Sequence, residues 1–198
     1  MEEFMIDNEF ILGEKEINQE INQAVLEQRT ADFKGKKLQC LLLAEKIIDC
    51  GLDLQDSAII GNVFMANASV NGSVNLARAW IGGSLFLGQA KINGDLSLQN
   101  GKIGQSANMV GLKLSGSLDL NETRVNGFVS LAKAQIEGNA DLKNIAVADY
   151  AIDRLTVKGD IYLGGAAIKG TFDMTGAKLD GRASLENSTI AVDKTARP

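Results

Sequence analysis

The sequence predicts an all-β fold: a right-handed parallel β-helix, or β-solenoid, with about 22 residues per coil and a short N-terminal helical cap. The first observation is a phrase of eleven residues, G-x-L-x-L-x-x-A-x-I-x, which recurs from residue 52 to residue 190; residues 83–92 are a clean copy. The second is the alternation inside L-x-L and A-x-I, which places both apolar residues of each triplet on one side of a short strand. Repeats at a fixed short period are typical of solenoids, whose coils stack around a continuous core.

Composition supports the same fold class. The chain has 21 glycines, one proline and only 5% aromatic residues. This composition suits a narrow coil interior better than a layered globular core. At 198 residues, the chain is long enough for one domain with an extension.

Residues 1–35 are predicted to be an acidic N-terminal segment with an amphipathic helix. Residues 1–30 hold eight acidic and two basic residues, a net charge of −6, whereas the whole chain carries −5 and residues 31–198 about +1. Ile17, Ile21 and Val25 recur every four residues, which predicts a helix over residues 14–28. We expect it to cover the open end of the first coil, since a solenoid must hide its edges and core. The alternative is a dimerisation helix or a helix that binds a partner.

Residues 36–190 form the predicted β-helix. Eleven residues supply two short faces and two corners, so two phrases make one coil of 22 residues, and about seven coils are expected. The right hand follows from the rule for parallel crossovers. A glycine precedes the first apolar residue of most phrases by two positions, where a corner requires positive φ or close backbone approach. Lys46 falls where a small inward residue belongs, so we expect the first coil to be distorted or open at its edge.

The end of the β-helix is less regular. At residues 148–149 one corner is a residue short, and the pattern is restored at once. Counting back from Ile161 predicts four inward side chains: Tyr150, Ile152, Leu155 and Val157. Residues 191–198 are predicted to be a flexible tail. The sequence shows no second capping helix, so the last coil is a candidate surface for self-association by end-to-end stacking.

Several units resemble the A-(D/N)-L-x-x unit of pentapeptide-repeat proteins, namely residues 31–35 (ADFKG), 74–78 (VNLAR) and 140–144 (ADLKN). The resemblance covers residues 31–190 and implies a right-handed quadrilateral β-helix with four five-residue faces. This chain alternates five- and six-residue units, which favours a variant branch of the family. The resemblance also implies an alternative function, because some members resemble duplex DNA in size and charge and bind type II topoisomerases.

The residues point away from catalysis. The chain contains no histidine, the commonest general base and metal ligand, which excludes hexapeptide-type acyltransferases that depend on one. Cys40 and Cys50 match no metal-binding spacing and are predicted to be free thiols of a cytoplasmic protein. Glycine-rich corners without a following helix are not phosphate loops. We therefore predict no catalytic, cofactor-binding or metal-binding residue, no cofactor and no enzyme activity.

The repeat allows the outward residues to be assigned to faces. One face carries a candidate interaction patch near the N-terminal end, made by Leu42, Phe64 and Phe86, with Trp80 around the corner. The opposite face carries a candidate acidic column of Asp53, Asp119 and Asp141. The two remaining faces lean basic, but short lysine columns do not make a groove for nucleic acid, so no nucleic-acid contact is predicted. No apolar run approaches the ~20 residues of a membrane span, so no membrane contact is predicted either.

These faces predict a non-catalytic structural or protein-interaction module that presents flat surfaces to a partner or to itself, as a homodimer or by end-to-end stacking. The alternative is the DNA mimic that binds a type II topoisomerase, although such a mimic needs a strongly negative rod and this coil is near neutral. Because a contiguous apolar patch is unusual on a monomer, we also predict that residues 1–30 fold back over it or over the patch of a second copy.

Overall fold

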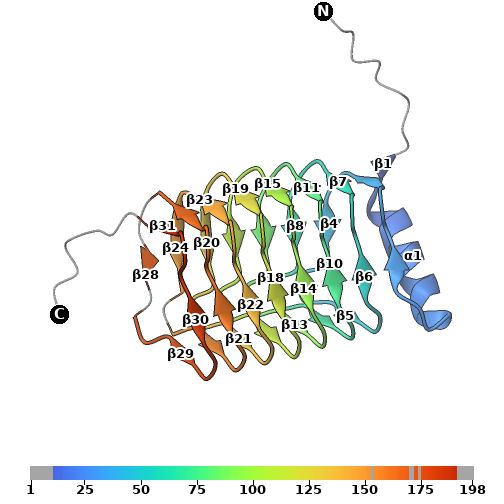
Figure 1. Cartoon of the computed structure of the whole chain (residues 1–198). Helices are drawn as coiled ribbons and strands as arrows, with labels where there is room; N and C mark the ends of the chain where they lie inside the picture. Colours follow the sequence, from blue (N-terminus) through green and yellow to red (C-terminus); the bar gives the residue numbers. More distant parts are fainter. Residues whose placement is uncertain (1–10, 153, 170–171, 174, 191–198) are drawn as a thin grey trace, which may run out of the picture.

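The protein is an all-β parallel β-solenoid with a short helix at its N-terminal end (Figure 1). The computed structural model describes residues 11–152, 154–169, 172–173 and 175–190. Four parallel sheets run along the coil axis, and each coil adds one short strand to each sheet. Within one coil the chain passes in turn through one strand of each sheet. We call the sheets B, A, C and D in that order and give their strands below; B lies opposite C, and A lies opposite D.

Sheets A and B follow the two halves of the first eleven-residue phrase of each coil. Sheet A contains β1 (Ile11–Leu12), β3 (Lys37–Leu38), β7 (Ala58–Ile59), β11 (Trp80–Ile81), β15 (Lys102–Ile103), β19 (Arg124–Val125), β23 (Ala146–Val147), β27 (Ala167–Ile168) and β31 (Thr189–Ile190). Sheet B contains β2 (Ala31–Asp32), β6 (Leu52–Asp53), β10 (Val74–Asn75), β14 (Leu96–Ser97), β18 (Leu118–Asp119), β22 (Ala140–Asp141), β26 (Ile161–Tyr162) and β30 (Ala183–Ser184).

Sheets C and D follow the second phrase. Sheet C contains β4 (Leu41–Leu42), β8 (Val63–Phe64), β12 (Leu85–Phe86), β16 (Ala107–Asn108), β20 (Phe128–Ser130), β24 (Asp149–Ala151) and β28 (Phe172–Asp173). Sheet D contains β5 (Ile47–Ile48), β9 (Ser69–Val70), β13 (Lys91–Ile92), β17 (Lys113–Leu114), β21 (Gln135–Ile136), β25 (Thr156–Val157) and β29 (Lys178–Leu179).

The predicted period is confirmed by the strand register. Val74 pairs with Leu52 on one side and with Leu96 on the other, each 22 residues away. Sheet B has eight strands, which correspond to about eight coils where about seven were predicted. The difference arises because the solenoid begins at β2, inside the residues that the sequence assigned to the N-terminal segment.

The core is a single column of side chains inside the coil, as the alternation predicted. Leu85, Leu87 and Ala90 are fully buried, whereas Phe86 is half-buried and Lys91 is exposed. The four side chains after the short corner near residue 148 point inward, as predicted. The side chains of Tyr150, Ile152, Leu155 and Val157 are at most 1% exposed.

The corner glycines serve close approach, and among the described ones that precede a phrase only Gly72 also has a positive φ, of 153°. A Cβ on Gly116 would lie 2.7 Å from the backbone carbon of Gly94 in the preceding coil, and a Cβ on Gly94 would lie 2.7 Å from the backbone nitrogen of Ser73. Real side chains do not tolerate such distances, so glycine allows the coils to stack. Positive φ occurs regularly at a different corner, the turn after each L-x-L triplet, where Asn100 (φ 58°) is one of many non-glycine residues.

The helix α1 (Glu14–Leu26) lies across the N-terminal end of the coil (Figure 1). Its stripe of Ile17, Ile21 and Ala24 is buried against the first coil, which confirms the prediction of a cap. The Lys46 Nζ donates to Asn18 Oδ1 of the helix at 3.1 Å. Lys46, which occupies the position of a small inward residue in the repeat, therefore extends to the helix and is not buried in the core.

The prediction that the N-terminal segment folds back over the aromatic patch of its own chain is wrong for the residues that the structure describes, and contact with the patch of a second copy stays a prediction. Residues 11–30 pack on the coil end, mainly against β2, with β1 extending sheet A beside β3. Trp80 keeps 47% and Leu42 37% of its surface exposed. The open coil end buries the helix stripe, so that stripe has no apolar surface left for the patch. Residues 1–10, with Phe10, and the predicted tail at residues 191–198 lie outside the described residues.

Candidate interaction surface

The predicted interaction patch is assembled by sheet C. Strand pairing places Leu42, Phe64 and Phe86 in one outward column, because β4, β8 and β12 are in register. The rings of Phe64 and Phe86 stack in parallel, with centroids 5.1 Å apart and planes 6° from parallel. Their inward neighbours, Val63 and Leu85, are fully buried in the coil. The rings of Phe64 and Phe86 are thus not needed to fill the core, and they lie outside it on the surface of the solenoid.

Trp80 joins this patch from the neighbouring sheet. It lies on β11 of sheet A, and a Cβ on Gly82 would lie 3.0 Å from Trp80 Cη2, so the indole extends over the corner glycine. This corner, Gly82 and Gly83, leads directly into β12 and Phe86. The four predicted residues therefore lie on two adjoining faces that meet at one corner.

Sequence reasoning missed half of this surface. The turn after each strand of sheet C adds one further outward residue. Together the two columns form a surface that we call face C, which comprises Leu42, Ala44, Phe64, Ala66, Phe86, Gly88, Asn108, Val110, Ser130, Ala132 and Ala151. The second column could have been predicted from the sequence, because its outward position follows that of the first column by two residues. Phe128, which is the first residue of β20 and is 46% exposed, was also missed.

The predicted acidic column lies on sheet B, but its carboxylates have local structural partners. Asp119 Oδ1 accepts a hydrogen bond from the Asn121 backbone N–H at 2.9 Å, and Asp141 Oδ1 accepts one from the Lys143 N–H at 3.1 Å. Asp53 Oδ1 does the same for Gln55. A short polar side chain that accepts from the residue two positions on is an Asx turn. The aspartates thus shape the turn that follows each strand.

The charge of this column is partly neutralised. Asp141 Oδ2 lies 2.9 Å from Lys143 Nζ, and the same ammonium lies 5.4 Å from the centre of the Tyr162 ring. Burial raises the pKa of Asp119 above its usual value, and its backbone hydrogen bond only partly offsets this effect. Asn75 and Ser97 separate Asp53 from the other two aspartates. Sheet B therefore does not carry a continuous row of carboxylates.

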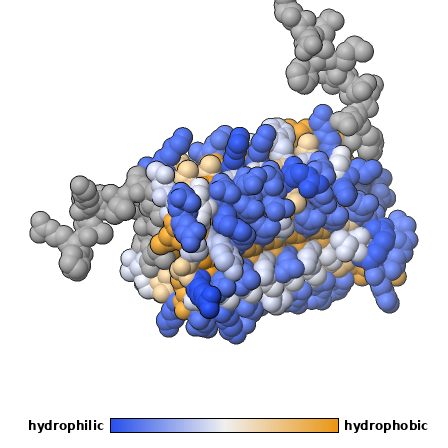
Figure 2. Space-filling view, viewed as in Figure 1, coloured by the Kyte–Doolittle hydropathy of each residue, from blue (hydrophilic) through white to orange (hydrophobic). Residues whose placement is uncertain are grey.

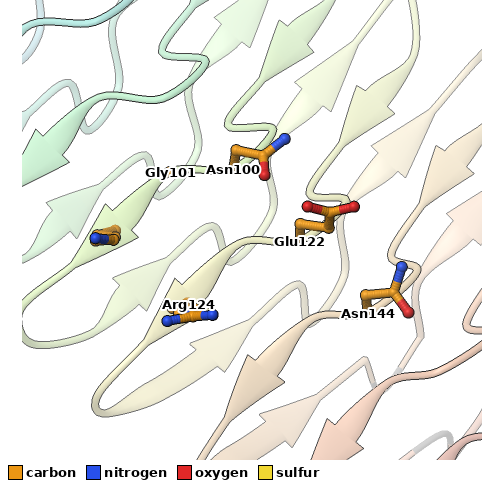
Figure 3. Close-up of a pocket in the computed structure, with 6 residues that line it drawn as sticks. Asn100, Gly101, Glu122, Arg124 and Asn144 are labelled. Carbon is orange, nitrogen blue, oxygen red and sulfur yellow. The ribbon is translucent and has the colours of Figure 1, made fainter.

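A shallow depression lies elsewhere on the described surface, at the corner between sheets B and A. It holds about 420 Å³ and is lined by Asn100, Gly101, Lys102, Glu122, Arg124 and Asn144. Figure 3 shows Glu122 on the turn and Arg124 on the following strand, with Asn100 and Asn144 on the turns of the flanking coils. These side chains come from successive coils at equivalent positions, so the depression is a by-product of the repeat.

Other features of the surface are modest. Hydrophilic residues cover most of the side shown in Figure 2, with a narrow hydrophobic stripe along the coil axis.

Cys40 and Cys50 are free thiols, the second of them buried. The helix in the described part of the chain has 13 residues and is neither long nor apolar enough to cross a membrane.

Comparison with family models, with curated proteins and with solved structures found no match to this chain. The fold alone therefore defines its class, a parallel β-solenoid repeat protein with an N-terminal helical cap. Such a fold is compatible with a structural or interaction module.

Proposed function

We propose that this protein is a non-catalytic structural and interaction module whose rigid solenoid presents face C to a protein partner. The observation that carries the proposal is the stacked pair of Phe64 and Phe86, which lies outside a core that is already filled. Aromatic side chains supply large contact areas at low entropic cost and are enriched at protein interfaces. Trp80, 47% exposed, adds a third aromatic ring at the edge of the same surface.

A non-catalytic role is supported by the way the polar residues are used. Asp95 and Asp160, which lie singly at corners, accept hydrogen bonds from backbone N–H groups of the next coil at 2.7 and 2.8 Å. The Arg182 N–H holds the pKa of Asp160 below its usual value. A carboxylate committed to the backbone in this way is unsuited to general base catalysis, which needs a pKa near the working pH.

The DNA-mimic hypothesis draws less support from this geometry. A mimic of duplex DNA needs regularly spaced, unneutralised charge. Here Asp141 is paired with Lys143, and the outward residues of sheet B between Asp53 and Asp119 are uncharged. We therefore favour a partner that binds face C over a partner that binds the acidic column.

Relationship to pentapeptide-repeat proteins is proposed at the level of the coil. Four sheets per coil and an Asx turn at the (D/N) position of the repeat support it, as in residues 74–78, where Asn75 Oδ1 accepts from the Ala77 N–H at 3.1 Å. The cytoplasmic location stays a prediction that rests on the free thiols and on the sequence.

Site-specific photo-cross-linking in cells tests the proposed function. A photoreactive residue placed at Phe86 should yield cross-links to a protein, whereas one placed at Ser97, the outward residue of β14 on the opposite sheet, should yield few. Mass spectrometry then identifies what is attached. Equal yields at the two positions, or none at either, would contradict the proposal. A topoisomerase attached at a third position, Asp119, would favour the DNA mimic instead.

A further inference from the structure

Face C is uncharged over five complete coils of the described residues, from Leu42 to Ala132, and at Ala151 of the sixth; the next outward position of that coil, Asp153, lies outside the described residues. Within the described residues, none of its members from Leu42 to Ala151 is ionisable, and all but Ser130 are half-buried or exposed. The opposite face is built on the same repeat, yet it carries Asp53, Asp119, Asp141 and Lys143. The repeat itself therefore does not require an uncharged surface. An uncharged face on one side only is typical of a surface that a partner covers and shields from water.

Side-chain size changes along face C. The outward residues of the first three strands are large, namely Leu42, Phe64 and Phe86. Those of the next three are smaller, namely Asn108, Ser130 and Ala151. A surface that is bulky at one end and recessed at the other is complementary to its own copy turned end for end.

We infer that the partner of face C is a second copy of this chain, packed face to face about a two-fold axis with the two coil axes antiparallel. An axis that passes between β12 and β16 sets Phe86 against Asn108 of the second copy. It sets Phe64 against Ser130 and Leu42 against Ala151 in the same way. Each bulky residue then meets a small one, at the spacing of about 10 Å that packed sheets adopt. This inference rests on the proposed function and specifies its partner.

Charges along the rim of face C agree with this orientation. The left-handed turn residues at the border of sheets C and D include Glu45, Lys133 and Arg154, all exposed. Among the described residues, none of the three has an ion pair or a side-chain hydrogen bond within its own chain. The antiparallel two-fold keeps this border against the same border of the second copy. It sets Glu45 near Arg154 of the second copy, and Asn67 near Lys133.

The size of the face predicts a reversible dimer. Six strands at a spacing of about 4.8 Å and four residues at about 3.3 Å give a surface of about 29 by 13 Å. Two copies then bury about 750 Å², to which Trp80 and Phe128 add at the edge, so the interface is smaller than the roughly 1,200–2,000 Å² of stable complexes and is of the weak, transient kind. Such a dimer should form and dissociate with protein concentration.

Sedimentation velocity of the full chain over about a hundredfold range of concentration tests the inference. We expect a dimer that dissociates on dilution. Phe86→Glu buries a charge in the interface and should give a monomer at every concentration. Ser97→Glu adds the same charge on the opposite face and should leave the dimer unchanged. A thermal melt of each variant shows that the coil is folded.

A charge exchange tests the orientation with variants that leave face C itself intact. Glu45→Lys and Arg154→Glu should each raise the dissociation constant of the dimer about tenfold, since each change places like charges together twice per dimer. The double variant should restore the wild-type value.

Three results would overturn the inference: a wild-type chain that is monomeric throughout, a Phe86→Glu variant that dimerises like the wild type, or a double exchange no tighter than the single variants. The proposed function has a separate outcome. If the chain is monomeric but the photoreactive residue at position 86 still attaches a different protein, face C is an interaction surface and only its assignment to a second copy fails.

Discussion

At the residue scale, the solenoid is specified by polar side chains as well as by apolar ones. The residue after most corner glycines accepts a hydrogen bond from the next coil, as Asn62 Oδ1 does from the Ser84 N–H at 2.7 Å and Ser117 Oγ from the Asn139 N–H at 3.1 Å. These groups would otherwise face a corner where the strands no longer pair, and an unpaired backbone group is costly. The conspicuous Ser, Asn and Asp residues of the repeat are therefore structural.

The inward and outward positions can be tested on two adjacent residues. Leu98→Asp places an unpaired charge in the core, where Leu98 is 1% exposed. We expect it to prevent folding or to lower the free energy of unfolding by several kcal/mol, at least about 3. Ser97→Asp, next to it, should change that free energy by less than about 0.5 kcal/mol. Similar denaturation midpoints for the two variants would show that the assignment is wrong.

The close approach at the corner makes a second prediction. Gly116→Ala should destabilise the protein by about 2 kcal/mol or more, because its Cβ would lie 2.7 Å from the Gly94 backbone and the coils would have to separate. Gly88→Ala is the matched control, since the nearest atom to its Cβ would be 3.8 Å away. Chemical denaturation measures both. An equal loss would mean that the corner glycine supplies only backbone freedom.

At the scale of the element, the Glu20 carboxylate of the cap links the helix to the first strand of the coil. Glu20 Oε1 accepts hydrogen bonds from Arg29 Nη1 at 2.5 Å and from the Asp32 N–H of β2 at 2.8 Å. The Arg29 hydrogen bond holds the pKa of Glu20 below its usual value, in spite of partial burial. Since the folded-state pKa is depressed, this stabilisation is fully present at neutral pH and is lost as the pH falls through the folded pKa.

Glu20→Gln should therefore lower the melting temperature at neutral pH, by an amount that corresponds to about 0.5–1 kcal/mol. The difference from the wild type should shrink as the pH falls below the ordinary range of a glutamate, because the wild-type carboxyl then becomes neutral as well. Glu122→Gln, at an exposed turn residue, is the control and should have little effect at any pH. A difference that stays constant into acid would rule out the titration of Glu20 as the cause.

At the scale of the whole molecule, the two ends of the rod differ. The helix covers the first coil, where Phe33, Leu38 and Leu41 are fully buried. In the last coil, Leu185 occupies an inward position of the repeat and is still 47% exposed within the described residues. End-to-end stacking of two molecules through the C-terminal coil thus stays a prediction. Stacking through the N-terminal coil would require the helix α1 to detach from that coil.

Deletion of residues 1–30 tests what the cap does. We expect the truncated protein to melt at a lower temperature and to associate, because the core of the first coil and the edge of β3 become exposed. Emission of Trp80, the one tryptophan of the chain, should stay unchanged, since the cap does not cover it. Ile17→Ser with Ile21→Ser weakens the same packing in the full-length chain and should act in the same direction. A red shift on deletion would instead show that the segment reaches the patch.

The sequence by itself determined the coil of 22 residues, the inward side chains and the helical cap, because each depends on a period that can be read within one or two phrases. Only the tertiary structure decided why the corner glycines are needed and what the aspartates do. Their partners belong to the coil 22 residues away or to the turn beside them, as with Gly116 beside Gly94 and Asp119 at Asn121. It also decided that the described part of the N-terminal segment leaves Trp80 and the aromatic patch uncovered. The physical reason is that the stripe of Ile17, Ile21 and Ala24 is already buried against the first coil, and only four residues join Leu26 to β2.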